Sequence, residues 1–369
     1  MFIVSALSPQ NLSAQNVPVK ELLQPYIDSG ELPGIVTVIA DTTGVLQIDA
    51  VGYADLETKR PMTEDTLFWM ASQTKQIAAV AVMMLVEDGK VKLDEPLTTY
   101  LPEMKELKVI SEKNDKQIVL VSPDKPLTLR MCLSHTAGFP FLTPFALRHD
   151  IDSLPIEKAL TTYIMTPLIG QPLKQYVYSN IGINVASAVV QRVSGVPFEK
   201  FLKERLFDPL EMKETTFFPT AEQLKRIANP YKLNKKTEKL EYVQINHLTY
   251  PFDLSERYPE AGGGLFSTPK EWIKIYQMFA NEGTFNGKKI ISPESLKEIR
   301  TKQTGELKEN YGFGVNISGD LFGHGGSHGT QSRVNYKTGR IAQYYIQQAG
   351  LPKAGEAEQK FMKAAFQDK

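Results

Sequence analysis

An unbroken apolar stretch lies in the first quarter of the chain. Every residue from 77 to 86 is apolar, and Ser72 and Lys75 stand just before it. A helix over residues 72–87 would have no polar stripe to turn toward water, so the pattern predicts a helix buried on all sides, which Gly89 can end. The stretch is shorter than the roughly 18 apolar residues that a membrane-spanning helix needs. We therefore expect a protein that is soluble once mature.

Shorter patterns predict the remaining elements. Residues 17–26 have helical periodicity, and residues 34–40 and 45–52 read as the two strands of a hairpin. Pro and Gly delimit three further helices, at residues 155–164, 182–193 and 197–207. A helix over residues 269–281 precedes β-type runs at 311–317, 329–336 and 341–347 and a closing helix at 354–367. The order is α/β, then α, then α/β.

Composition narrows the possible partners. The chain has 369 residues, of which 42% are hydrophobic, enough for a sizeable core. Its 42 Lys and Arg balance its 42 Asp and Glu, so no net field attracts nucleic acid or an acidic membrane surface. A small substrate that is recognised locally fits better. The single cysteine, Cys132, excludes an internal disulfide framework and a multi-thiolate metal site.

Residues 1–16 form a possible signal or disordered leader. Residues 1–7 are largely apolar and Leu12-Ser13-Ala14 resembles the end of a signal peptide, but no Lys or Arg precedes the apolar residues. A cleaved export signal predicts a periplasmic or secreted protein, and its absence predicts a cytoplasmic one. Both alternatives stay open.

Ser72 and Lys75 are the first candidate catalytic residues. They are three positions apart at the start of the predicted buried helix, so the hydroxyl and the amine lie on one face and can meet. A serine is a weak nucleophile until a base takes its proton, and burial favours the neutral lysine amine that can do so.

The same Ser-x-x-Lys spacing occurs twice more. Prolines in and after Ser122-Pro123-Asp124-Lys125 predict a loop, and Ser267-Thr268-Pro269, before Lys270, is typical of a helix cap with Pro at the first helical position. Ser72 itself could be no more than an N-cap serine. A function at Ser72 therefore depends on other groups that reach it.

Tyr178-Ser179-Asn180 is the second candidate motif, just before an apolar helical run. A tyrosine with its usual pKa of about 10 serves as a base or proton relay only beside a cation such as Lys75. The alternative is a buried tyrosine with a satisfied hydroxyl and an asparagine that caps the helix.

Residues 323–329, Gly-His-Gly-Gly-Ser-His-Gly, are the third candidate. Glycines let backbone amides approach a ligand closely, as an oxyanion site requires, although a turn between strands has the same composition. His324 and His328 are not expected to share a metal, because helical spacing cannot be assumed across the glycines and no acidic or cysteine ligand clusters nearby. We predict no metal and no cofactor.

Six segments together resemble the serine β-lactamase and penicillin-binding-protein superfamily. The likeness is greatest to the class C β-lactamase-like branch, which includes D-alanyl-D-alanine peptidases and family VIII carboxylesterases, and it covers residues 18–350. The combination is specific, although each segment is weak evidence. The six segments are Phe68-Trp69-Met70-Ala71-Ser72-Gln73-Thr74-Lys75, Gly89-Lys90-Val91-Lys92-Leu93-Asp94-Glu95-Pro96, Leu133-Ser134-His135-Thr136-Ala137-Gly138, Tyr178-Ser179-Asn180, Gly262-Gly263-Gly264-Leu265 and Gly323-His324-Gly325-Gly326.

The resemblance implies a β-lactamase/transpeptidase-like α/β (α+β) fold, in which an antiparallel sheet is flanked by helices and an all-helical domain is inserted. On this chain the sheet domain would comprise residues 17–70 and 240–369. The mainly helical domain would comprise residues 71–239, with the catalytic cleft between the two.

The resemblance also implies a nucleophile and its partners. Ser72 would be acylated, Lys75 would activate it, and Tyr178 would act as general base or relay. The backbone amides of Ser72 and Ser327 would form the oxyanion hole. Asn180 would orient the substrate amide or ester.

His324, Gly325 and Gly326 would line the substrate site by the same resemblance. Here the chain departs from the family, because His324 and Gly325 replace the lysine and threonine of a Lys-Thr-Gly triad. A neutral or half-charged imidazole binds a carboxylate less surely than an ammonium does. The departure weakens a lactamase interpretation and favours uncharged esters.

We therefore expect a serine hydrolase that works through an acyl-enzyme, a carboxylesterase acting on small uncharged esters. A β-lactamase or D-alanyl-D-alanine carboxypeptidase is the alternative, and a non-catalytic penicillin-binding-like sensor or scaffold is the alternative from another class. The expected partner is a small-molecule ester, lactam or peptide, with no nucleic acid and no integral membrane segment. The oligomeric state stays open.

Two other motifs offer competing interpretations. Gly325-Gly326-Ser327-His328-Gly329 matches the nucleophile elbow of α/β-hydrolases, but beyond Ser327 the only histidine is His328 within the elbow itself, whereas that fold needs an acid and then a histidine after the serine. Lys337-Thr338-Gly339 spells the missing triad between two β-type runs, so we expect residues 335–340 to form a hairpin turn. At about 3.3 Å per residue, the preceding strand would carry this turn roughly 25 Å from the cleft.

Overall fold

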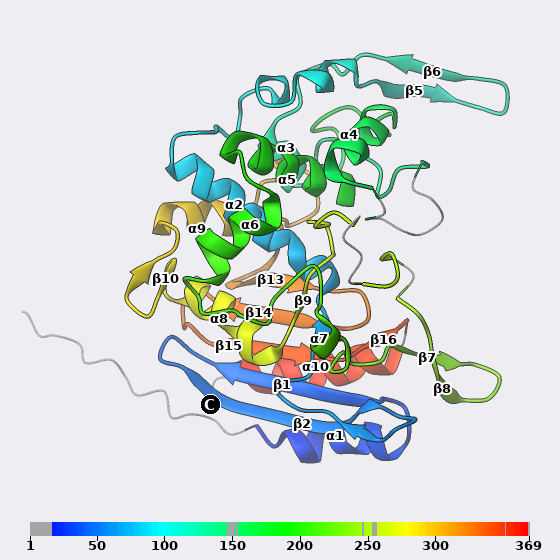
Figure 1. The fold of residues 1–369 in the computed structure, drawn as a ribbon, viewed down its shortest axis with the longest axis vertical. Coiled ribbons are helices and arrows are strands. Elements are labelled where there is room, and N and C mark those ends of the chain that lie inside the picture. Colours follow the sequence, from blue (N-terminus) through cyan, green and yellow to red (C-terminus); the bar gives the residue numbers. More distant parts are fainter. Residues whose placement is uncertain are drawn as a thin grey trace, which may run out of the picture.

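The computed structural model describes residues 17–145, 152, 154–245, 247–252, 257–350 and 352–367. The possible leader at residues 1–16 lies outside these ranges. Within them, no helix has both the length and the apolar character that crossing a membrane requires. A seven-stranded sheet forms the lower part of the molecule in Figure 1, and helices form most of the upper part.

The sheet joins the two ends of the chain. β1 (Gly34–Ala40) pairs with β15 (Ile341–Tyr345) on one side and with β2 (Val45–Asp55) on the other. The strand order is β12-β13-β14-β15-β1-β2-β3, and every neighbouring pair is antiparallel. The other strands are β3 (Arg60–Pro61), β12 (Asn316–Ser318), β13 (Leu321–Gly325) and β14 (Gln331–Asn335). An antiparallel sheet built from both ends, with helices inserted between them, confirms the predicted fold class.

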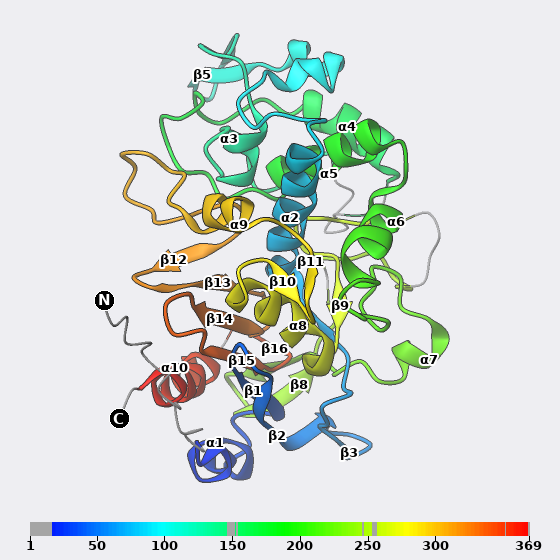
Figure 2. The ribbon, with the colours of Figure 1, turned by 90° about the vertical axis from the view of Figure 1, so that its left-hand side faces the viewer.

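Helices cover both faces of the sheet (Figure 2). Neighbouring residues of a strand point to opposite faces, and in β1 both faces are apolar. Ile35 lies in the apolar cluster with α1 (Val19–Asp28) and α10 (Pro352–Phe366). Val36 lies in the larger core, which includes α8 (Pro269–Ala280). β1 is therefore buried along its whole length.

α2 (Thr74–Glu87) runs through the centre of the molecule (Figure 1). Its residues from Thr74 to Leu85 are buried, as the apolar pattern predicts, and a 3-10 turn, η1 (Ala71–Gln73), precedes it. α5 (Asn180–Ser194) packs against α2. Further helices here are α3 (Leu129–Leu133), α4 (Ile156–Ile164), α6 (Phe198–Leu202) and the π-helical turn η4 (Lys203–Phe207). The boundaries proposed for two separate domains stay a prediction.

Small elements complete the fold. Paired short strands are β4 (Phe68–Trp69) with β9 (Phe266–Ser267), β5 (Val109–Lys113) with β6 (Ile118–Val121), β10 (Thr284–Phe285) with β11 (Lys288–Lys289), and β7 (Tyr231–Asn234) with β8 (Lys239–Tyr242) and β16 (Gln348–Ala349). The remaining helical elements are α7 (Ala221–Leu224), α9 (Pro293–Arg300), η2 (Leu97–Thr99) and η3 (Pro102–Glu106).

The prediction of a strand over residues 311–317 is wrong for most of its length, since β12 begins at Asn316. Gly314 adopts a φ of +64°, and a Cβ atom built there would lie 2.5 Å from the carbonyl oxygen of Lys75. The backbone bends here because it passes tightly against the start of α2, which requires glycine. The side-chain pattern does not reveal this approach. It also fails to reveal the β5–β6 hairpin and α9.

Candidate active site

Ser72 lies in the turn that leads into α2. β4, which ends just before the turn, is paired with β9, and Ala71 adopts a φ of +48°, which residues with a side chain rarely occupy. Such conformations cluster at functional sites. The N-cap of α2 is Gln73, and no side chain caps the helix. The alternative that Ser72 is no more than an N-cap serine is therefore wrong.

Lys75 is fully buried, one helical turn after Ser72. Its Nζ donates three hydrogen bonds, to Ser72 Oγ (3.1 Å), to Asn180 Oδ1 (2.7 Å) and to the carbonyl oxygen of Gly262 (2.6 Å). These partners belong to η1, to α5 and to the segment before β9. Two distant parts of the chain thus join the neighbouring turn at one amine, and all three N–H bonds of an ammonium are used.

This geometry suits both protonation states of Lys75. Asn180 Oδ1 and the Gly262 carbonyl can only accept hydrogen bonds, whereas the Ser72 hydroxyl can accept or donate. A neutral amine would keep the first two bonds and turn its lone pair toward Ser72. A proton can therefore pass from Ser72 to Lys75 while the side chains stay in place.

Tyr178 stands beside the same amine. Lys75 Nζ is 4.6 Å from the centre of the Tyr178 ring, within the range of a cation–π contact. The rings of Phe141 and His324 stack on Tyr178 with centroid distances of 6.0 Å and 6.1 Å. Tyr178 thus lies beside the Lys75 amine, as a base or relay would have to, while the role itself stays a prediction.

Asn180 is the first residue of α5, but it does not cap the helix. Ser179 is the N-cap, and its Oγ accepts a hydrogen bond from the Gly182 amide at 3.1 Å. This division leaves Asn180 Oδ1 available for Lys75. The alternative that Asn180 serves as a cap is therefore wrong.

The glycine-rich stretch lies against the Ser72 turn. β13 ends at Gly325, and a Cβ atom on the next residue, Gly326, would lie 2.4 Å from the carbonyl oxygen of Met70. A side chain would keep the two backbones apart, so this approach requires glycine. It brings the end of β13 close to the backbone just before the Ser72 turn, and an oxyanion hole would use the amides of Ser72 and Ser327. That role stays a prediction.

His324 belongs to a buried chain of hydrogen-bonded rings. The Ser179 amide donates to His135 Nδ1 (3.2 Å), so neutral His135 carries its proton on Nε2 and donates it to the Tyr311 hydroxyl (3.2 Å). That hydroxyl donates to His324 Nε2 (3.0 Å), and His324 Nδ1 donates to the Gly325 carbonyl (2.5 Å). All donors point the same way along the chain, which assigns one tautomer to each imidazole.

Both histidines are neutral. Burial, reinforced by the positive charge of Lys75, lowers the pKa of His324 to about 3 and holds the pKa of His135 well below its usual value. His324 therefore offers no positive charge to a substrate at neutral pH. The sequence allowed either a neutral or a half-charged imidazole at His324, and the buried position favours the neutral one. His135 and Tyr311 were not predicted as site residues, although His135 lies within one of the six family-like segments.

Glu260 and Asn184 are further polar groups that the motifs do not indicate. Glu260 is fully buried, and Asn184 Nδ2 donates to its Oε1 at 2.9 Å. Asn184 Oδ1 in turn accepts from the Gly262 amide at 3.2 Å. Burial raises the pKa of Glu260 to about 7, although the charge of Lys75 opposes the shift. The sequence offers only a weak indication of Glu260, which is a glutamate two residues before three consecutive glycines.

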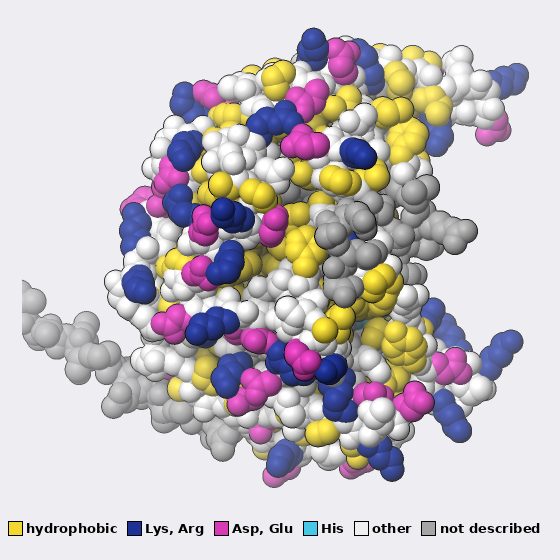
Figure 3. Space-filling model, viewed as in Figure 1, with side chains coloured by type: hydrophobic (Ala, Val, Ile, Leu, Met, Phe, Trp, Pro, Cys, Tyr) yellow, Lys and Arg dark blue, Asp and Glu magenta, His cyan; other side chains and the backbone are white. Residues whose placement is uncertain are grey.

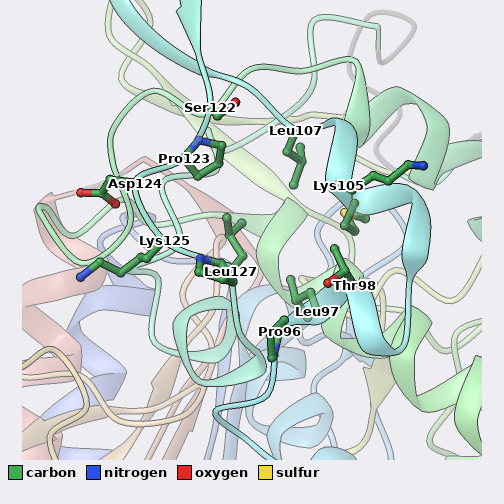
Figure 4. Close-up of a pocket in the computed structure, with 12 residues that line it drawn as sticks. Pro96, Leu97, Thr98, Lys105, Leu107, Ser122, Pro123, Asp124, Lys125 and Leu127 are labelled. Carbon is green, nitrogen blue, oxygen red and sulfur yellow. The ribbon is translucent and has the colours of Figure 1, made fainter.

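The other two Ser-x-x-Lys matches lie in a loop and at a helix cap, as the sequence predicts. Ser122 and Lys125 line a pocket of about 350 Å³ beyond the end of β6, and Figure 4 shows the hydroxyl and the amine pointing in different directions. Thr268 caps α8 with Pro269 at the start of the helix. Lys270, on that helix, lies 3.8 Å from two surface carboxylates.

Lys337-Thr338-Gly339 forms the turn between β14 and β15, as predicted. Gly339 has a φ of +73°, and Asn335 Oδ1 accepts from the amides of Lys337 and Thr338. Lys337 Nζ pairs with Asp320 at 3.0 Å, and 63% of the lysine side chain is exposed. The triad is a surface turn.

Ser327 lies in the connection between the antiparallel strands β13 and β14. The nucleophile elbow of an α/β-hydrolase joins a strand to a helix, so that alternative is wrong. Ser327 Oγ instead lies 3.0 Å from His328 Nδ1. In the part of the chain that the structure describes, no three His, Cys, Asp or Glu side chains are grouped as a metal ion would need.

Known proteins share this architecture. Residues 19–366 match the family model described as Beta-lactamase. An uncharacterized protein of Mycobacterium tuberculosis is 29% identical over 343 residues, which cover 86% of this chain and 83% of that protein. The lovastatin esterase of Penicillium rubens is 30% identical over 275 residues, 70% of this chain and 67% of the esterase. A solved structure, EstCE1, a hydrolase with promiscuous acyltransferase activity, has a TM-score of 0.78 at 23% identity and covers 95% of this chain and 97% of its own. The chain thus belongs to the beta-lactamase family.

Proposed function

We propose that the protein is a serine hydrolase that forms an acyl-enzyme on Ser72, and that it acts as a carboxylesterase on small uncharged esters. The observation that carries this proposal is the 3.1 Å hydrogen bond between Ser72 Oγ and the amine of Lys75, a lysine whose other two donors are already engaged. Family membership and a relative named as an esterase support the reaction class.

Acylation begins when Ser72 Oγ attacks the ester carbonyl carbon. Lys75, in its neutral form, takes the hydroxyl proton, and Lys75 and Tyr178 together return a proton to the alkoxide that leaves. The amides of Ser72 and Ser327 stabilise the negative oxygen of the tetrahedral intermediate. A water molecule then attacks the acyl-enzyme and gives a proton to the same pair. The acid is released, and Ser72 regains its hydroxyl proton.

The neutral state of His324 supports an uncharged substrate. Its ring stacks on Tyr178, where the related lactamases carry a lysine, and its pKa of about 3 keeps it uncharged. The Lys75 amine is fully occupied by Ser72, Asn180 and Gly262. A substrate carboxylate would therefore lack the ammonium partner that the family triad supplies.

Apolar side chains on the loops that carry Phe141 and Ile169 support the same preference. Two loops are tied together by backbone hydrogen bonds, including one from the Ile169 amide to the Gly138 carbonyl at 2.8 Å. Phe141, which stacks on Tyr178, and Ile169 remain 41% and 48% exposed. On the face in Figure 3, hydrophobic side chains gather at mid-height, between the helical part and the sheet. Such a surface favours the apolar part of an ester.

Three substrates test the proposal on the purified protein: a short-chain aryl ester, a chromogenic cephalosporin and a D-alanyl-D-alanine peptide. We expect turnover of the ester, with little or none of the other two. Turnover of the cephalosporin or the peptide without the ester would favour a β-lactamase or carboxypeptidase. A stable mass adduct on Ser72 that is never released would favour the sensor alternative.

A further inference from the structure

Glu260 has no part in the steps above, yet its carboxyl group is connected to Lys75. We propose that Glu260 is a positioning residue for the Lys75 amine. Its carboxylate holds the Gly262 carbonyl in place through Asn184, and its negative charge stabilises the positive charge that Lys75 gains when it takes the Ser72 proton. This inference rests on the proposed function of Ser72 and Lys75.

A continuous path of hydrogen bonds links the two groups. Asn184 Nδ2 donates to Glu260 Oε1 (2.9 Å), Asn184 Oδ1 accepts from the Gly262 amide (3.2 Å), and the Gly262 carbonyl accepts from Lys75 Nζ (2.6 Å). The carboxylate fixes the orientation of the Asn184 amide, because its oxygen can only accept. Asn184 therefore has to present its own oxygen to Gly262.

The carboxyl group also packs directly against the glycines. A Cβ atom on Gly262 would lie 2.5 Å from Glu260 Oε1 and 2.7 Å from Asn180 Cγ, and one on Gly263 would lie 3.4 Å from Glu260 Oε2. The Glu260 carbonyl accepts from the Gly264 amide at 2.7 Å. These contacts place the carboxyl group close to both Gly262 and Asn180, each of which binds Lys75.

The groups facing Glu260 define how it responds to pH. Asn184 Nδ2 also lies 3.2 Å from the hydroxyl of Tyr163, on α4, and 2.9 Å from that of Tyr258, just before Glu260 in the chain. Burial raises the pKa of both tyrosines well above its usual value, so they stay neutral around pH 7. From α2, Lys75 in its protonated form contributes a positive charge that favours the Glu260 carboxylate.

One more charge acts on Glu260. Asp152, buried and paired with Arg257, opposes ionisation of Glu260. Burial is the largest influence, and the pKa of Glu260 lies at about 7. Because the pKa of Glu260 is raised to about 7, the carboxylate is present above about pH 7 and is lost as the pH falls through that value. The carboxylate should therefore stabilise the protonated Lys75 amine above about pH 7 and lose this effect below that pH.

The test measures how fast Ser72 is acylated by a fluorophosphonate, read as the mass of the intact protein, between about pH 5.5 and about pH 9. In the natural protein the rate should rise as the pH passes about 7. Glu260→Gln keeps the size and the acceptor but never carries a charge. At high pH it should react about tenfold more slowly, the effect of one pK unit of coupling, and its rate should no longer rise near pH 7.

Glu271→Gln is the matched control. It removes another buried carboxylate, one that accepts from the amides of Lys213 and Glu214. The Glu271→Gln variant should still show the rise in acylation rate near pH 7, and its rate should stay within about twofold of that of the natural protein. Glu260→Asp, which restores a charge, should recover the rise in part.

Several outcomes would overturn the inference. One is a rate in the natural protein that does not change near pH 7, a measurement that needs no variant to fold. Another is a Glu260→Gln rate that is lowered equally at every pH but still rises there, which would mean that the residue acts through structure alone. Absence of any labelling of Ser72 in the natural protein would instead contradict the proposed function.

Discussion

Two lysines in this chain belong to signature-like motifs, and their surroundings differ completely. Lys75 is buried and donates to three groups, two of which come from distant segments. Lys337 is 63% exposed and pairs with Asp320 at the surface. Both motifs match their consensus letter for letter. The difference lies in which segments converge on the lysine, because convergence brings a hydroxyl within reach of the buried amine of Lys75, whereas the amine of Lys337 meets a surface carboxylate.

The two glycine-containing segments differ in the same way. Gly339 in the Lys337 turn is needed for its positive φ, a local requirement of a hairpin, and the nearest atom that a Cβ there would meet belongs to a side chain, that of Thr42. Gly326 is needed because its backbone approaches the Met70 carbonyl, a long-range requirement. A local requirement produces a turn anywhere in a protein, whereas a long-range one marks a place where two segments have to meet. The following predictions test that distinction.

The largest effect is expected at Ser72. Ser72→Ala should lower ester hydrolysis by at least about 10³-fold, because it removes the hydroxyl proposed to carry the acyl intermediate, and should abolish fluorophosphonate labelling. Ser327→Ala is the matched serine, since its amide and not its hydroxyl is proposed to act, and it should still be labelled. Labelling retained in the Ser72 variant but lost in the Ser327 variant would reverse the assignment.

Lys75→Ala and Tyr178→Phe should come next. Each should slow acylation by about 10²-fold, the usual loss when acid–base catalysis is removed. In the double variant the two losses should not add, because the residues act as one unit on one proton. Single-turnover kinetics on an aryl ester would measure this. Full activity of Tyr178→Phe would show that Lys75 alone is the base.

His324→Ala should change ester turnover or substrate preference by about tenfold, because it removes a ring that stacks on Tyr178 and accepts from Tyr311. In the natural protein, titration of His324 should leave no trace in the rate above about pH 5, since its pKa is about 3 and the imidazole is already neutral. The pH dependence of kcat/KM compared between the two proteins checks this. A step near pH 6 that disappears in the variant would contradict the neutral state of His324.

The smallest effect is expected at Lys337. Lys337→Ala removes a surface ion pair with Asp320, which is worth at most about 1 kcal/mol, and should leave ester turnover within about twofold. Measured beside His324→Ala under the same conditions, it gives the sharpest contrast between the two regions. If Lys337→Ala proved the more damaging, both the assignment of β13 to the active site and the argument for an ester would fail.

Local patterns predicted much of this molecule. Apolar residues without a polar stripe predicted α2, and the Lys337 turn followed from its position between two β-type runs. The grouping of Ser72, Lys75, Tyr178 and Asn180 followed from a family resemblance, which carries long-range information that spacing lacks. The geometry agrees with that grouping.

Contacts between residues far apart in the chain could not be predicted from the sequence pattern. Tyr311 binds both His135 and His324, and Glu260 reaches Lys75 through Asn184, yet no periodicity links these positions in the sequence. Residues 311–315 were expected in a strand because their apolar side chains resemble one. A close approach of two backbones, at Gly314 and Lys75, decides their conformation instead.

The Tyr311 hydroxyl lies between two buried, neutral imidazoles, those of His135 and His324. Its proton can exchange with water only when the surrounding segments open locally. Proton NMR could then detect it as a separate low-field signal, and its rate of disappearance in heavy water would report how often those segments open. The chain thereby contains its own reporter of local opening around the candidate active site, which needs neither substrate nor label.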